Sequence, residues 1–176
     1  MKNAVAVCAT MILGGCASAY RAPEAGASAR ISFDLTSDST GTTTRTFTAR
    51  AYEDLSCKPS KYGAKLDSKA LADAHEILGP IKVAGGSPFT FALSYIEARF
   101  AQNRECSYTA SFVPAAGQTY AINFAVVNQS LGCGLKITDQ SGASVQYQSP
   151  EYSCAETMAG KIKNGGAGIL DWKILP

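Results

Sequence analysis

Cysteine is the residue type with the greatest chemical potential in this chain, which has 176 residues, six cysteines and one histidine. Four cysteines lie in the body of the sequence, at Cys57, Cys106, Cys133 and Cys154. No two of them are separated by only two residues, and His75 is remote from them, so the spacing does not fit a zinc site. An even number of cysteines in an exported domain predicts two disulfides. Four cysteines allow three pairings, of which we favour Cys57–Cys106 and Cys133–Cys154.

Acidic side chains are the next candidates, because two carboxylates can act as general acid and base in a glycosidase. The candidate pairs are Glu97 with Glu105 and Asp38 with Asp54. No local pattern marks either pair among the 14 acidic residues. His75 beside Glu76 could also transfer protons, but sequence neighbours on a helix point in different directions. We therefore expect a protein that is not an enzyme, with no cofactor and no metal site.

A glycine-rich stretch and an aromatic pattern could each bind a ligand. Residues 164–168, NGGAG, lie close to Lys161 and Lys163, but they lack the preceding strand and following helix of a nucleotide-binding loop. The alternating aromatic residues could form a sugar- or peptide-binding face, but alternation itself predicts burial. They are Phe89, Phe91, Tyr95, Tyr108, Phe112, Tyr120 and Phe124.

The composition describes one globular domain. Hydrophobic residues make up 46% of the chain and charged residues 17%, which is enough apolar material to form a core. The net charge is only +2 and is spread along the sequence, so we expect no nucleic-acid partner.

The N-terminus has the pattern of an export signal. Lys2 is followed by an apolar run of ten residues, from Ala4 to Leu13. Ten helical residues reach about 15 Å, half of the roughly 30 Å bilayer core, so the run is too short to span a membrane stably. The sequence therefore predicts export into an oxidising compartment.

The residues that end this run, Leu13-Gly14-Gly15-Cys16, resemble the lipobox of bacterial lipoproteins. The resemblance implies a signal peptide over residues 1–15, a lipid on the Cys16 sulfur and an acylated amine, with palmitate as the expected chain. Because Ala17 is not aspartate, it also implies an outer membrane address facing the periplasm, if the host is Gram-negative. The alternative is ordinary secretion, with cleavage after Ala19 at an A-x-A site.

The segment after Cys16 is rich in Ala, Ser, Gly and Pro, and we interpret residues 16–29 as the lipidated cysteine and a flexible tether. Residues 30–176 then form the folded domain. Period-two alternation, as at Ile31, Phe33 and Leu35, recurs in about eight short segments that are separated by Gly and Pro turns. Helical spacing of apolar residues also predicts a short helix over residues 67–78.

This pattern predicts an all-β fold, an antiparallel β-sandwich of immunoglobulin-like or transthyretin-like type. The alternative is a closed up-and-down barrel with a ligand cavity. The last apolar run, Ile169 to Leu175, contains the only tryptophan, Trp172. Since it follows all the cysteines, the chain lacks the Cys…Trp…Cys order of true immunoglobulin domains.

The central piece F-x-P-x-x-G-x-x-Y, from Phe112 to Tyr120, resembles a corner found in small bacterial β-sandwich lipoproteins of the envelope. The resemblance implies that the Tyr120 hydroxyl bonds the backbone of the preceding turn, as in a tyrosine corner. Gly117 would supply a positive φ angle there.

The function expected from the sequence is that of a membrane-anchored envelope lipoprotein, a non-catalytic binding or structural module. Its partners would be the membrane, through the lipid on Cys16, and another envelope protein. Two alternatives remain open: a small-ligand-binding β-barrel carrier, and a periplasmic hydrolase that uses carboxylates.

Overall fold

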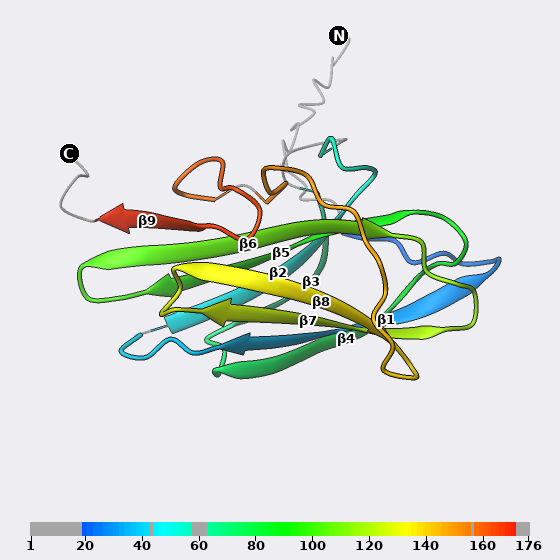
Figure 1. Cartoon of the computed structure of the whole chain (residues 1–176), viewed down its shortest axis with the longest axis horizontal. Helices are drawn as coiled ribbons and strands as arrows, with labels where there is room; N and C mark the ends of the chain where they lie inside the picture. Colours follow the sequence, from blue (N-terminus) through cyan, green and yellow to red (C-terminus); the bar gives the residue numbers. More distant parts are fainter. Residues whose placement is uncertain (1–18, 43, 58–62, 156, 172–176) are drawn as a thin grey trace, which may run out of the picture.

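The structure of the protein, a computed structural model, describes residues 19–42, 44–57, 63–155 and 157–171. The described residues form nine strands and no helix (Figure 1). The predicted signal peptide, Cys16 and Trp172 lie outside the described residues. The strands are β1 Ser28–Ser37, β2 Thr44–Tyr52, β3 Ala64–Ala70, β4 His75–Ala84, β5 Phe89–Ala98, β6 Gln102–Phe112, β7 Thr119–Val127, β8 Gly132–Asp139 and β9 Ala167–Asp171.

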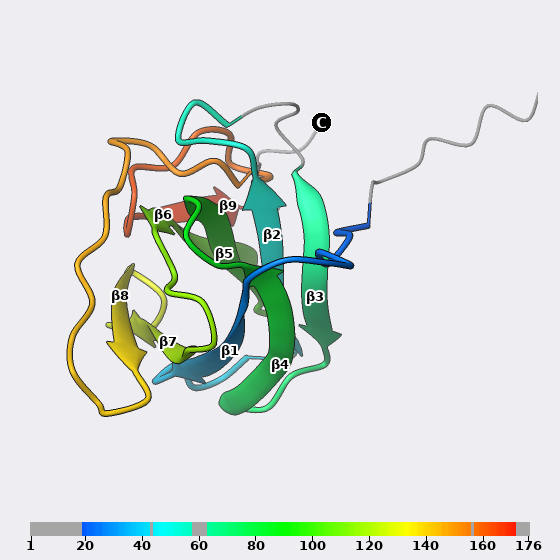
Figure 2. The same ribbon diagram turned by 90° about the vertical axis from the view of Figure 1, so that its right-hand side faces the viewer.

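Two sheets lie face to face, which confirms the predicted β-sandwich. The four-stranded sheet has the order β4-β1-β7-β8, and the five-stranded sheet has the order β3-β2-β5-β6-β9 (Figure 2). All neighbouring strands are antiparallel except β1 and β7, which run parallel from Arg30 beside Thr119 to Ser37 beside Val126. Among the described strands no pairing joins the two sheets, so the closed barrel is wrong.

The core lies between the sheets and consists of the apolar half of each alternating strand. Ile31, Phe33 and Leu35 of β1 are buried, and they face Phe91 and Leu93 of β5. The Phe33 and Phe91 rings lie 5.8 Å apart across the sandwich. Burying one such side chain is worth about 1.5–3 kcal/mol, so the period-two pattern is the main source of stability.

The helix predicted over residues 67–78 is wrong, because the segment contains the end of one strand, a turn and the start of a strand in the other sheet. Residues 64–70 form β3, and β4 begins at His75. Leu71 turns the chain with a left-handed φ of 52°. A helix of about 12 residues is marginal by itself in water. Here β3 pairs with β2 and β4 pairs with β1, so the sheet partners outweigh the local helical spacing.

Two further segments depart from the regular strands. Residues 144–148 form no strand; Ser144 and Gln148 make single bridges to Thr138 and Ser111 as the chain crosses from one sheet to the other. The last apolar run is a strand only up to Asp171 within the described residues.

Two disulfides are present, as predicted, but they connect Cys57 with Cys154 and Cys106 with Cys133. The favoured pairing was therefore wrong. Cys106 on β6 and Cys133 on β8 both point into the space between the sheets, so they meet across the core. Cys57 lies after β2, where it packs with Cys154 and Tyr52 in a separate small cluster outside the main core. Sequence spacing does not show which cysteine side chains face the core and which lie outside it.

The tyrosine corner is confirmed. The buried Tyr120 hydroxyl accepts a hydrogen bond of 2.8 Å from the backbone N–H of Ala115. Gly117 lies between them with a φ of 77°, a conformation that costs a residue with a Cβ more than it costs glycine. The bond therefore holds the β6–β7 turn against the start of β7.

Replacing Tyr120 by Phe removes this bond and leaves the ring. We expect a loss of about 1 kcal/mol in the free energy of unfolding, measured by urea denaturation. Tyr152→Phe, at a half-exposed tyrosine, is the control and should unfold as the wild type does. Equal midpoints for Tyr120→Phe and the wild type would contradict a stabilising corner.

Candidate functional site

Four strand connections lie at the same end of the sandwich, on the left in Figure 1. They are residues 38–42, 71–74, 99–101 and 128–131. The strand register brings them together, because Ser37 lies beside Val126, Thr36 beside His75, and Thr44 beside Ala98. We call this group of connections the loop end. The chain enters β1 at the opposite end.

A buried carboxylate lies directly beneath the loop end. Glu97 continues the inward-facing series of β5 after Phe91, Leu93 and Tyr95, and it has no exposed surface. One of its oxygens accepts a hydrogen bond of 2.8 Å from the Tyr95 hydroxyl, and the other accepts one from Arg99 Nε. An isolated charge in such a place would be very costly, so these donors are essential.

The pKa of Glu97 depends on two opposing effects, burial and hydrogen bonding. Burial by itself would raise the pKa, because it disfavours the charged form. Hydrogen bonds from Ser39, Arg99, Tyr95 and Ser130 oppose burial and bring the pKa below its ordinary value of 4.5. Glu97 is therefore ionised at neutral pH and acts as a fixed acceptor, not as a proton donor.

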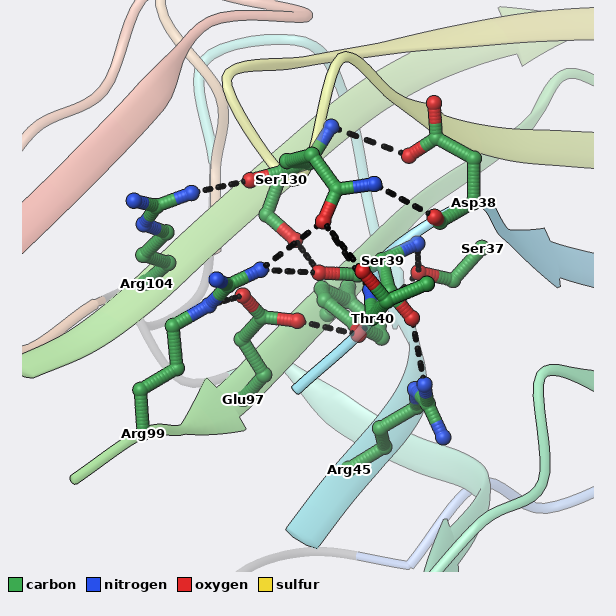
Figure 3. A network of polar contacts seen from close by, with 11 residues as sticks. Ser37, Asp38, Ser39, Thr40, Arg45, Glu97, Arg99, Arg104 and Ser130 are labelled. Carbon is green, nitrogen blue, oxygen red and sulfur yellow. Dashed lines mark hydrogen bonds and ion pairs between the residues drawn. The ribbon is translucent and has the colours of Figure 1, made fainter. Parts of the chain in front are cut away.

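Ser39 connects this carboxylate to the surrounding loops (Figure 3). Its hydroxyl accepts a bond of 2.6 Å from Arg99 Nη2 and one of 3.2 Å from the Ser130 hydroxyl. Its backbone oxygen accepts a bond from Arg45. Arg104 donates to the backbone oxygen of Gln129 in the β7–β8 turn. Three arginines from β2, the β5–β6 turn and β6 thus hold loops that come from the other sheet.

The β7–β8 turn has a strained backbone. Asn128, Gln129 and Ser130 have φ angles of 56°, 57° and 68°, which is the left-handed region and is unusual for three consecutive residues other than glycine. Asp38 holds this turn, since its two carboxylate oxygens accept the backbone N–H groups of Asn128 and Gln129 at 2.8 and 3.0 Å. Strain of this kind persists only where surrounding contacts enforce it, and it is typical of functional loops.

Large apolar side chains stand at the tips of three of the four connections. Phe100 is fully exposed, Leu71 is 77% exposed, and Leu131 is 54% exposed. A single exposed apolar residue needs no explanation. Three at one end of the sandwich are candidates for contact with another molecule, because exposed aromatic and aliphatic side chains serve as anchors in protein interfaces.

The residues considered for acid–base chemistry do not converge. Glu97 faces the core, whereas Glu105 lies on the outer side of the same sheet and accepts the backbone N–H groups of Met158 and Ala159. Asp38 is at the loop end, and Asp54 is at the other end, where it accepts bonds from Ser56.

His75 does not act with Glu76. Its Nε2 lies 2.8 Å from Asp34 on the neighbouring strand, in an exposed position. Glu76 instead accepts the backbone N–H of Asp73 and lies 3.8 Å from Lys69. The two residues therefore support strand pairing and the β3–β4 turn.

In the glycine-rich segment 164–168, residues 164–166 form a connection that is fixed to β6, and Ala167 and Gly168 already belong to β9. The Asn164 side chain bonds both the N–H and the carbonyl of Thr109, and the Gly165 N–H donates to Ser107. The segment then enters β9. Because its backbone is used in this way, it does not form an anion-binding loop.

Two surface pockets lie away from the loop end. One, of about 460 Å³, lies between Pro88, Ser111 and residues 146–148. The other, of about 450 Å³, adjoins the Cys57–Cys154 disulfide and Lys161. Tyr147 beside the first pocket is not an acid–base group at neutral pH, because burial, with a contribution from Tyr108, raises its pKa to about 12.

Among the described residues, no three His, Cys, Asp or Glu side chains are grouped so that they could hold a metal ion. The same part of the chain forms no helix of the length and hydropathy that crossing a bilayer requires. Comparison of the sequence and the structure with protein-family profiles, with characterised proteins and with solved structures gave no match.

The loop end was not predicted from the sequence. Ser39 and Arg45 lie far from Arg99 and Gln129 along the chain, and the register of the two sheets brings them together. One signal was available. The inward series of β5 is apolar up to Tyr95 and then reaches Glu97, and a charged residue on a buried face predicts a partner cation.

Glu97→Gln should destabilise the protein by about 2 kcal/mol near neutral pH, because an amide cannot replace a charged acceptor between Arg99 and Tyr95. The folded pKa of Glu97 is lowered, so its stabilising effect is complete above pH 4.5 and is lost as the pH falls through the folded pKa. The stability difference between the variant and the wild type should therefore shrink in acid.

Urea unfolding at several pH values measures this difference, and Glu151→Gln, at an exposed acid, is the control. A Glu97→Gln protein as stable as the control at neutral pH would show that the buried network contributes nothing to stability.

Proposed function

We propose that this protein is an exported lipoprotein of the bacterial envelope, anchored through a lipid on Cys16, and that it is a non-catalytic binding module. In a Gram-negative host it would sit in the outer membrane and face the periplasm. The observation that carries the binding role is the loop end, where exposed apolar tips stand on a buried polar network.

Three features support the export part of the proposal. The sequence begins with an apolar run and a lipobox-like stretch that ends in Cys16. Both disulfides involve buried or half-buried cysteines, and disulfides persist in oxidising compartments. The two disulfides close loops of 97 and 27 residues. By the loop-entropy model, each disulfide stabilises the fold by about 3–5 kcal/mol.

The position of the loop end relative to the N-terminus supports the binding role. The chain enters β1 at Ser28, and β1 runs for ten residues toward the loop end. At about 3.3 Å per residue, the strand spans about 33 Å. A lipid near the start of the chain would therefore leave Phe100 and Leu71 directed away from the bilayer, where another envelope protein can reach them.

The alternatives have less support. A carrier needs an enclosed apolar cavity, whereas the rings of Phe33, Phe47, Phe91 and Phe124 are buried in the space between the sheets. A hydrolase that uses two carboxylates needs them in one cleft, whereas Glu97 and Glu105 lie on opposite sides of the five-stranded sheet.

The lipid anchor can be tested with two matched cysteine variants. Cys16→Ser should abolish lipidation and move the protein out of the membrane fraction, whereas Cys8→Ser, within the signal, should leave both unchanged. Mass spectrometry of the N-terminal peptide measures the outcome. An unmodified N-terminal Tyr20 in the wild type would instead show ordinary secretion after Ala19.

The binding surface can be tested with a photo-crosslinking amino acid in intact cells. Placed at Phe100, it should give a discrete crosslinked product that is lost when Leu71→Ser is added. Placed at Met158, an exposed apolar residue outside the loop end, it should not give that product. Identical products from both positions would contradict a specific contact at the loop end.

A further inference from the structure

We infer that residues 19–20 form a strap that holds the domain directly against a lipid surface, with the strap side toward the bilayer and the loop end away from it. The inference rests on the proposed lipid at Cys16. It identifies a second interaction surface, around the strap, and its partner is the anionic headgroup layer of the anchoring membrane.

The strap is docked on the body of the protein. Ala19 forms a parallel bridge with Lys65, and the Tyr20 N–H donates to the Lys65 carbonyl at 3.0 Å. The Tyr20 hydroxyl donates to the Lys82 carbonyl at 3.3 Å, and its ring packs edge-on against Phe89. Lys65 belongs to β3 and Lys82 to β4, the outer strands of the two sheets. Tyr20 therefore bridges the edges of both sheets.

The docking limits the distance between the lipid and the domain. Only two residues lie between Cys16 and Ala19. Three steps along the chain span at most about 11 Å, even when fully extended. A tether that was free up to Ser28 would allow about 40 Å. The strap thus changes a long flexible connection into a short one, and a short connection restricts how the domain can orient.

The charges around the strap suit an anionic surface. Arg21, Lys65 and Lys82 are all exposed, and each lies in or next to the strap contacts. Glu24 is the acidic residue in the same N-terminal segment. Basic residues within a Debye length of anionic lipids are attracted to them, and a lipid anchor keeps these residues within that range.

The orientation can be measured with the full-length lipidated protein in vesicles of phosphatidylglycerol and phosphatidylcholine. A fluorescent amino acid is placed either at Ser87, in the turn next to Phe89, or at Ala101, at the loop end; both positions are exposed. Energy transfer to labelled headgroups should be about two-fold or more greater from Ser87 than from Ala101, because the two positions differ by about one strand length.

Tyr20→Ala should release the strap and remove most of the difference in energy transfer between Ser87 and Ala101. Tyr152→Ala should preserve this difference. Trypsin provides a second readout, since cleavage after Arg21 should become several-fold faster in Tyr20→Ala than in the control. Reversing the charge at Lys65 and Lys82 should reduce the difference in these vesicles, whereas reversal at the exposed Lys136 of β8 should not.

Equal energy transfer from the two positions in a protein that mass spectrometry shows to be lipidated would overturn the strap and leave the proposed function intact. A protein without lipid on Cys16 would overturn the anchor and this orientation together. An unchanged difference in Tyr20→Ala would show that the docked segment does not orient the domain.

Discussion

A carboxylate without exposed surface is the constraint on which one whole end of this protein depends. Glu97 is ionised between two sheets, so it must have donors, and these come from Tyr95, Arg99 and the Ser39 region of the β1–β2 connection. Once Ser39 is fixed, Asp38 is in place to bind the left-handed β7–β8 turn. A single buried charge thereby links three of the four connections of the loop end into one hydrogen-bonded network.

The two disulfides complement this network by adding covalent links between other segments of the chain. Cys106–Cys133 crosses the core between β6 and β8, and Cys57–Cys154 joins two long connections outside it. Cys133 follows the 128–131 connection by two residues, so this disulfide anchors β8 where it leaves the loop end. The connections themselves are held by polar contacts, whereas the long irregular segments around Cys57 and Cys154 are held covalently.

Sequence reasoning was successful wherever one residue and its near neighbours determine the structure. Alternation predicted the strands, and Gly117 with Tyr120 predicted a corner that the structure contains. It failed where distant strands decide the outcome. The helix over 67–78 was a plausible local pattern, but sheet pairing overrode it, and the cysteine pairing depended on which side of a sheet each sulfur faces. The network around Glu97 joins residues from 37 to 130, and no local pattern could have assembled it.

The parallel pairing of β1 with β7 has a consequence for biogenesis. β1 is an inner strand of its sheet, yet one of its two neighbours starts only at Thr119, about 90 residues later in the chain. The sheet is therefore incomplete until most of the polypeptide has been synthesised, and contacts of such long range form slowly. A chain with this topology completes its fold late relative to its synthesis, which would suit the export proposed for this protein.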